Sequence, residues 1–159
     1  KKGRIEGVNV VFVGDGNSNV CRSLTEAVLK LGGRMTIASP KKYMPPDSFI
    51  GGLGIGRASL TLTEDHLGAV KEADVVYTDV WVSMGQEAEA QERVASLGPY
   101  QLNSDLMARA PADAIVMHCL PAHRGQEITD EVADSSRSVI FDQAENRLHA
   151  QKGLMALII

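Results

Sequence analysis

The sequence predicts an α/β domain built on a doubly wound, mainly parallel sheet with helices on both faces. Three observations lead to this prediction. Short apolar runs rich in β-branched residues alternate with segments whose apolar residues recur at helical spacing. Glycine or proline stands at several of the boundaries between them. The length of 159 residues suits one domain with its own core, and strands that alternate with helices favour a parallel sheet.

The first third of the chain shows this alternation clearly. Residues 8–13 are β-branched and aromatic and predict a buried strand, which ends in the tight turn Gly14–Gly16. A helix is expected over 20–31, because its apolar residues recur every three or four positions, and the glycines at 32–33 end it. Residues 35–38 predict the second strand.

The same reasoning assigns the remaining elements. Prolines predict a loop over 39–46. Further strands are expected at 59–63, 75–78, 114–117 and 139–141. The expected helices are one capped by Thr63 and ending at 73, then 87–97, 104–110, a short helix capped by Thr129, and 144 to the end of the chain. The charged residues of 87–93 are expected to form a solvated helix face.

Composition excludes several classes of protein. A formal net charge of −4 and a pI near 5.5 argue against a general nucleic-acid binder. The apolar stretches are shorter than the roughly 20 residues that a membrane-spanning helix needs. Two cysteines make no disulfide framework and suit a reducing compartment, so we expect a cytoplasmic protein. The chain opens on Lys1 just before a strand and closes on the apolar run 157–159, which predicts a domain of a longer protein.

The glycine turn after the first strand invites a dinucleotide-binding interpretation. Gly14 and Gly16 match the first two glycines of that fingerprint, but Asn19 stands where the third is required. The second strand ends in Ala38-Ser39-Pro40 and lacks the acidic residue that would bind a ribose. The sequence therefore disfavours NAD or NADP as a cofactor.

A loop that can bind a zwitterion follows the strand at 75–78. Asp79 can pair with an ammonium group, while Ser83 and a backbone amide near Gly85 can meet a carboxylate. The same spacing also fits a helix N-terminus that Ser83 caps.

The segment His118-Cys119-Leu120-Pro121-Ala122-His123-Arg124-Gly125 ends another strand. A zinc site needs about four ligands, and the sequence has no second Cys/His pair at the spacing typical of such a site, so a metal is disfavoured. A Cys–His nucleophile is awkward, because adjacent strand residues point to opposite faces. Cys119 also fits a small buried hydrophobic residue. A cis peptide before Pro121 would aim the carbonyls of Cys119 and Leu120 inward.

The last helix opens with Asp142-Gln143-Ala144-Glu145-Asn146-Arg147. Arg147 is expected in its first turns, where a cation opposes the helix dipole. An arginine at this position is therefore better explained by binding a ligand or forming an ion pair than by stabilising the helix.

Taken in order, Asp79-x-x-x-Ser83-Met84-Gly85, His118-Cys119-Leu120-Pro121 and Phe141 to Arg147 resemble the second half of the ornithine carbamoyltransferases. The likeness runs over essentially the whole chain and is weakest between residues 46 and 59. Aspartate carbamoyltransferases share the fold but carry different loops at these places.

The resemblance implies transfer of a carbamoyl group from carbamoyl phosphate to the δ-amine of L-ornithine, giving citrulline and phosphate, with no metal or other cofactor. It implies that Asn19 and Asp79 hold the α-carboxylate and α-ammonium groups of ornithine, and that Ser83 and Met84 complete the pocket. It further implies that Cys119 and Leu120 meet the reacting groups and that Arg147 binds carbamoyl phosphate.

Residues 1–159 are then the ornithine-binding domain of a two-domain enzyme. The family's Ser-x-Arg-Thr-Arg and His-Pro-x-Gln elements are absent here, because they belong to an amino-terminal domain. Ser18-Asn19 replaces the usual pair of asparagines, and four glycines between 51 and 56 stand where relatives have a longer helical stretch. Relatives are usually trimers, so a homo-oligomer is expected.

Two other functions fit the same fold. A carbamoyltransferase for putrescine is disfavoured, because Asp79 and Asn19 suit the α-groups of an amino acid. A non-catalytic binding or regulatory relative would lack the phosphate-binding element upstream. A substrate panel and the upstream sequence discriminate between these alternatives.

Overall fold

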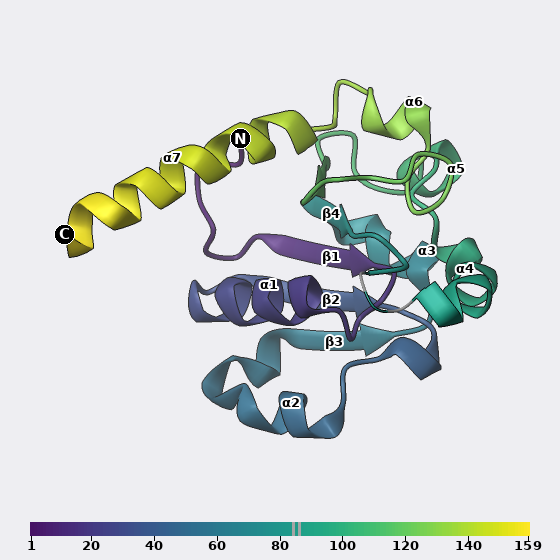
Figure 1. Ribbon diagram of the computed structural model, residues 1–159. Helices are drawn as coiled ribbons and strands as arrows, with labels where there is room; N and C mark the ends of the chain where they lie inside the picture. The colour runs from purple at the N-terminus through teal and green to yellow at the C-terminus, as the bar shows by residue number, and fades with distance from the viewer. Residues whose placement is uncertain (84, 86) are drawn as a thin grey trace.

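The centre of the fold is a five-stranded, fully parallel sheet with the strand order β3-β2-β1-β4-β5. The computed structural model describes residues 1–83, 85 and 87–159. The strands are β1 (Asn9–Val13), β2 (Arg34–Ala38), β3 (Leu60–Thr63), β4 (Val75–Thr78) and β5 (Ile115–His118). Figure 1 shows helices on both sides of this sheet, as the sequence predicted.

The strand order places a topological switch point beside β1. The chain moves from β1 to β2 on one side and later returns to pair β4 with the other side of β1. In open parallel sheets, ligands bind outside the carboxyl ends of the strands at such a point. The loops after β1 and β4 therefore border the crevice where a ligand is expected.

Helices and short 3-10 turns connect the strands. The helices are α1 (Asn19–Lys30), α2 (Asp47–Gly52), α3 (His66–Ala69), α4 (Ala90–Leu97), α5 (Ser104–Met107), α6 (Asp130–Ala133) and α7 (Ile140–Ile158). The 3-10 turns are Lys41–Tyr43, Gly54–Ser59, Val70–Glu72, Glu87–Glu89 and Gly98–Tyr100. The glycine-rich segment is thus a short helix and a 3-10 turn, separated where Gly54 takes a φ of +61°.

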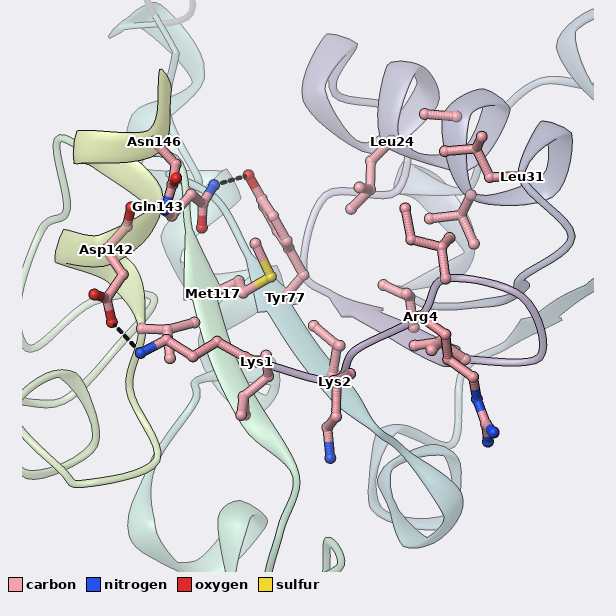
Figure 2. A pocket seen from close by; sticks show the side chains of 18 of the residues that line it. Lys1, Lys2, Arg4, Leu24, Leu31, Tyr77, Met117, Asp142, Gln143 and Asn146 are labelled. Carbon is pink, nitrogen blue, oxygen red and sulfur yellow. Dashed lines mark hydrogen bonds and ion pairs between the residues drawn. The ribbon is translucent and has the colours of Figure 1, made fainter. Parts of the chain in front are cut away.

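The two faces of the sheet are covered to different degrees. Val11 and Val13 point to one face and pack with residues from the segments that carry α5 and α6. Val10 and Phe12 point to the other face, where α1 contributes Cys21 and its neighbours. On this second face an apolar groove of about 660 Å³ lies between α1 and α7. Figure 2 shows its floor and walls, with the amino-terminal residues crossing its mouth.

Three expectations about local structure were wrong: the strand over 139–141, the start of the last helix at 144, and the helix cap at Thr63. Val139–Phe141 is not a strand: Ser138 makes one isolated bridge to Val116 of β5, and α7 begins at Ile140. β-branched composition predicted a strand here, but one bridge provides no ladder. The cap of α3 is Asp65 rather than Thr63, because the Asp65 carboxylate accepts from the amide of Gly68 at 2.8 Å.

Candidate functional site

The turn after β1 brings the start of α1 close to the sheet. Gly14 has a φ of +134°, which favours glycine. A Cβ on Gly16 would lie 2.6 Å from Cγ2 of Ile37, so only glycine allows this close approach. Ser18 caps α1 by accepting from the amide of Cys21 at 3.1 Å. Asn19 is the first residue of the helix and is exposed at this edge of the sheet.

Asp79 lies directly after β4 and is only 5% exposed. Its Oδ1 accepts from the backbone amide of Val80 at 2.8 Å and from the thiol of Cys119 at 3.0 Å. Because Cys119 follows β5, this contact joins the loops after two neighbouring strands. A buried carboxylate at the end of a strand is well suited to meet an ammonium group.

The thiol of Cys119 is a hydrogen-bond donor rather than a nucleophile. Burial and the neighbouring Asp79 carboxylate raise its pKa to about 12, so it stays protonated near neutral pH. His118 does not activate it: the imidazole is fully buried and holds the backbone beyond Cys119. This geometry agrees with the sequence argument that His118 and Cys119, as neighbours on a strand, are poorly placed to act as base and nucleophile.

The turn after β5 is held by a buried pair of side chains. His118 Nδ1 accepts from the amide of Leu120 at 2.8 Å, which leaves Nε2 to donate to Glu127 Oε1 at 3.2 Å. The same oxygen accepts from the amide of His123 at 2.6 Å. Leu120 has a φ of +54°, a costly conformation for leucine, and the peptide before Pro121 is cis, as the sequence suggested. A positive φ at a residue other than glycine, as at Leu120, is often found at binding sites.

Beside this turn lies a groove of about 1030 Å³, which we call the α7 groove. Its lining includes Cys119, Leu120 and Arg147. Arg147 is exposed and reaches the groove from α7. Because α7 begins at Ile140, Arg147 lies in the third helical turn, so the expected opposition to the helix dipole was wrong. An exposed arginine is free of that cost and can meet an anion.

Some of the predicted site residues therefore contact one another or line the same groove, and others lie in separate segments. Asp79 contacts Cys119, and Cys119 shares the α7 groove with Leu120 and Arg147. Asn19 begins α1 after the turn that follows β1, and the half-buried Ser83 lies in the loop after β4. Met84 lies outside the described residues.

A metal is not favoured by these side chains. Donor atoms of Asp79, His118 and Cys119 lie within 4.8 Å of one another. Both ring nitrogens of His118 already take part in hydrogen bonds, and the Cys119 thiol is protonated. A zinc ligand set needs a free imidazole nitrogen and a thiolate.

Sequence reasoning missed Asp15, Arg93 and Glu127. Arg93 was expected on a solvated face but is 4% exposed and forms an ion pair with Asp15. It lies four residues before the fully buried Leu97 and so shares its helix face. That spacing was the signal available in the sequence.

No helix among the described residues is long and apolar enough to span a membrane.

Comparison with known proteins agrees with this geometry. Residues 6–158 match the family model for "Aspartate/ornithine carbamoyltransferase, Asp/Orn binding domain". The ornithine carbamoyltransferase of Thermococcus kodakarensis is 55% identical over the whole chain. The solved structure of the Pyrococcus furiosus enzyme has a TM-score of 0.91 and 54% identity, covering 99% of this chain and 51% of that one. An anabolic ornithine carbamoyltransferase from Campylobacter jejuni gives 0.89 at 34% identity, covering 99% of this chain and 52% of that one.

These relatives are longer than the chain, which spans about half of their length, 51% for the Thermococcus protein. The match nevertheless extends through the turn after β1, the loop after β4, the turn after β5 and most of α7. The chain belongs to the aspartate/ornithine carbamoyltransferase family.

Proposed function

We propose that the chain is the ornithine-binding domain of an enzyme that transfers the carbamoyl group of carbamoyl phosphate to L-ornithine, giving citrulline and phosphate. The observation that carries this proposal is the buried Asp79 carboxylate, which is hydrogen-bonded to a Cys119 thiol that in turn borders the α7 groove with Arg147. A site for a cation thus adjoins a site for an anion.

The amino-acid side of the site consists of Asn19, Asp79 and Ser83. Asp79 pairs with the α-ammonium of ornithine, because its carboxylate is shielded from water and accepts from two neutral groups, the Val80 amide and the Cys119 thiol. The amide of Asn19 and the hydroxyl of Ser83 suit the remaining α-carboxylate. Putrescine keeps an ammonium group but lacks the α-carboxylate, so it would leave Asn19 and Ser83 without their proposed partner.

The carbamoyl side of the site consists of Leu120 and Arg147, with Cys119 between the two sides. The δ-amine must attack as a neutral group, although a free alkyl ammonium has a pKa of about 10.4. A desolvated position beside the Leu120 carbonyl favours loss of that proton. The amine nitrogen then bonds to the carbamoyl carbon, the carbon–oxygen bond to phosphate breaks, and phosphate leaves with the bonding electrons. The departing phosphate takes up the proton that the new carbon–nitrogen bond displaces from the amine. The Arg147 guanidinium offsets the negative charge that develops.

The rest of the phosphate site belongs to a second, amino-terminal domain. Carbamoyl phosphate carries about two negative charges, and a chain of net charge −4 does not attract it strongly. The exposed apolar residues of α7, among them Leu148, Leu154 and Met155, offer a surface for that domain to cover. The homo-oligomeric state and the cytoplasmic location stay predictions.

The test uses the full-length protein, supplied with carbamoyl phosphate and one amine at a time. We expect citrulline from L-ornithine, and far less product from putrescine or L-aspartate. An enzyme that carbamoylates putrescine equally well would contradict the roles of Asn19 and Ser83, because putrescine keeps an ammonium group but lacks the α-carboxylate. Absence of both turnover and ornithine binding would favour the non-catalytic alternative instead.

A further inference from the structure

Arg93 of α4 is a buried guanidinium that lies outside the site described above. Its side chain is 5% exposed, and its Nη2 forms an ion pair with the buried carboxylate of Asp15. Its Nε donates to the backbone carbonyl of Trp81 at 2.6 Å. Its guanidinium carbon lies 4.8 Å from the centre of the Tyr43 ring. Its Nη1 lies 4.0 Å from the carboxylate of the nearby Glu89. The other three contacts engage segments that are distant in the sequence.

The three partners of Arg93 that are distant in the sequence belong to three loops at the same edge of the sheet. Asp15 lies in the turn after β1, Tyr43 in the segment after β2, and Trp81 in the loop after β4. These strands are neighbours in the order β2-β1-β4, so their carboxyl ends lie side by side. The Arg93 side chain thus cross-links the loops that border the switch point.

The cross-link bears directly on the amino-acid side of the site. Asp15 precedes Asn19 by four residues, within the turn that starts α1. Trp81 lies midway between Asp79 and Ser83, is 2% exposed, and packs with Tyr43. The distance between the groups that hold the two ends of an amino acid therefore depends on two contacts of one side chain.

Stability alone is a poor reason for this arrangement. Burying a guanidinium and a carboxylate has a desolvation cost that often equals or exceeds the energy of their attraction. A well-packed apolar side chain at this position would hold α4 against the sheet at least as well. A planar guanidinium, however, offers several donors in fixed directions, which sets the geometry of its acceptors.

We propose that Arg93 is a positioning residue for ornithine, which sets the spacing of Asn19 from Asp79 and Ser83 through its bonds to Asp15 and to the Trp81 carbonyl. The inference rests on the proposed function and deepens it. Arg93 does not touch the substrate. Its loss lets the two loops move relative to each other, and small displacements of binding groups have large effects on positioning.

The test compares Arg93→Lys with Arg137→Lys in the full-length enzyme. Arg137 is a matched control, because its guanidinium also cross-links loops, donating to the carbonyls of Ala114, Met107 and Pro111 at 2.7–2.9 Å. Those acceptors lie before β5 and away from the site. Lysine keeps the charge in both variants but cannot reproduce the fork of donors.

For Arg93→Lys we expect the KM for ornithine to rise by about 10- to 100-fold, with a smaller change in kcat and an unchanged KM for carbamoyl phosphate. For Arg137→Lys we expect a lower melting temperature with an ornithine KM within about twofold of wild type. Asp15→Asn removes the same ion pair from the other side and should repeat the ornithine effect, which decides the matter if Arg93→Lys does not fold.

Two results would overturn the inference while leaving the proposed function intact. One is a wild-type enzyme that makes citrulline, with Arg93→Lys and Asp15→Asn lowering only the melting temperature. The other is an equal rise of KM for both substrates. A wild-type enzyme that neither binds ornithine nor makes citrulline would instead contradict the proposed function itself.

Discussion

The amino-acid side and the carbamoyl side of the site differ in how firmly the chain itself holds them. Asp79, Asp15 and Arg93 are all at most 6% exposed and are tied by hydrogen bonds to loops after three neighbouring strands. Arg147, by contrast, stands exposed on α7, whose outer end projects from the sheet (Figure 1). The residues proposed for the amino-acid side are thus preorganised within this chain, whereas the proposed function requires a neighbouring domain to complete the carbamoyl side.

The largest expected effect comes from separating the two halves. Residues 1–159 alone should fold and bind ornithine weakly at most, yet form no measurable citrulline, because the α7 groove offers mainly Arg147 to a dianion. Adding the amino-terminal domain, within one chain or as a separate one, should restore turnover. A citrulline assay on both samples tests this. Substantial turnover by the isolated chain would mean that the carbamoyl side is complete without a partner.

The next effect is expected at the exposed arginine of the carbamoyl side. Arg147→Ala in the full-length enzyme should lower kcat/KM for carbamoyl phosphate by about 100- to 1000-fold, because one preorganised donor to developing negative charge is lost. Ornithine affinity should change little. Lys152→Ala removes the next cation along the same exposed helix and serves as the control. It should leave kcat/KM for carbamoyl phosphate nearly unchanged. Equal losses in the two variants would point to a general charge effect.

A smaller effect is expected on the amino-acid side. Asp79→Asn removes the charge that meets the α-ammonium, and a charge-assisted contact contributes about 1.5–3 kcal/mol. Ornithine affinity should therefore fall by roughly 10- to 100-fold, with carbamoyl phosphate binding unchanged. Calorimetric titration of each ligand on the full-length enzyme measures both. If affinity for both ligands fell together, misfolding would explain the result and the division into two sides would fail.

The smallest effect concerns the thiol between the two sides. Because burial and Asp79 raise the pKa of Cys119 to about 12, its thiolate fraction at pH 8 is on the order of one in ten thousand. Alkylation by iodoacetamide should be slow and should rise about tenfold per pH unit up to that value. Asp79→Asn removes a negative charge, lowers this pKa and should speed alkylation several-fold at pH 8.

Cys119→Ser is the control for the alkylation experiment, since the buried Cys21 should not react. The serine variant should also turn over more slowly without a change in melting temperature, because a hydroxyl is shorter than a thiol. If it lost only stability, Cys119 would be a packing residue. Rapid alkylation of the wild-type enzyme at pH 8 would show that Asp79 does not hold the thiol in its neutral form.

Local patterns in the sequence were sufficient for the fold class and for most of its elements. The run 8–13 and the helical spacing over 20–31 correspond to β1 and α1 within one residue or two, because both patterns reflect burial on one element. The same reasoning was wrong for Val139–Phe141. Its composition is that of a strand, yet only one bridge to β5 forms, and strand formation depends on a partner that lies far away in the sequence.

The sequence by itself determined the α/β class, the three strand-end segments that carry polar residues, and the family that those segments resemble. Only the tertiary structure decided which side chains meet: Cys119 with Asp79, His118 with Glu127, and Arg93 with Asp15 and Trp81. Local elements follow from periodicity along a few residues, so they are visible in a sequence. Contacts between residues 40 or 78 positions apart depend on the order of strands and on burial, and neither is encoded in any short stretch of the chain.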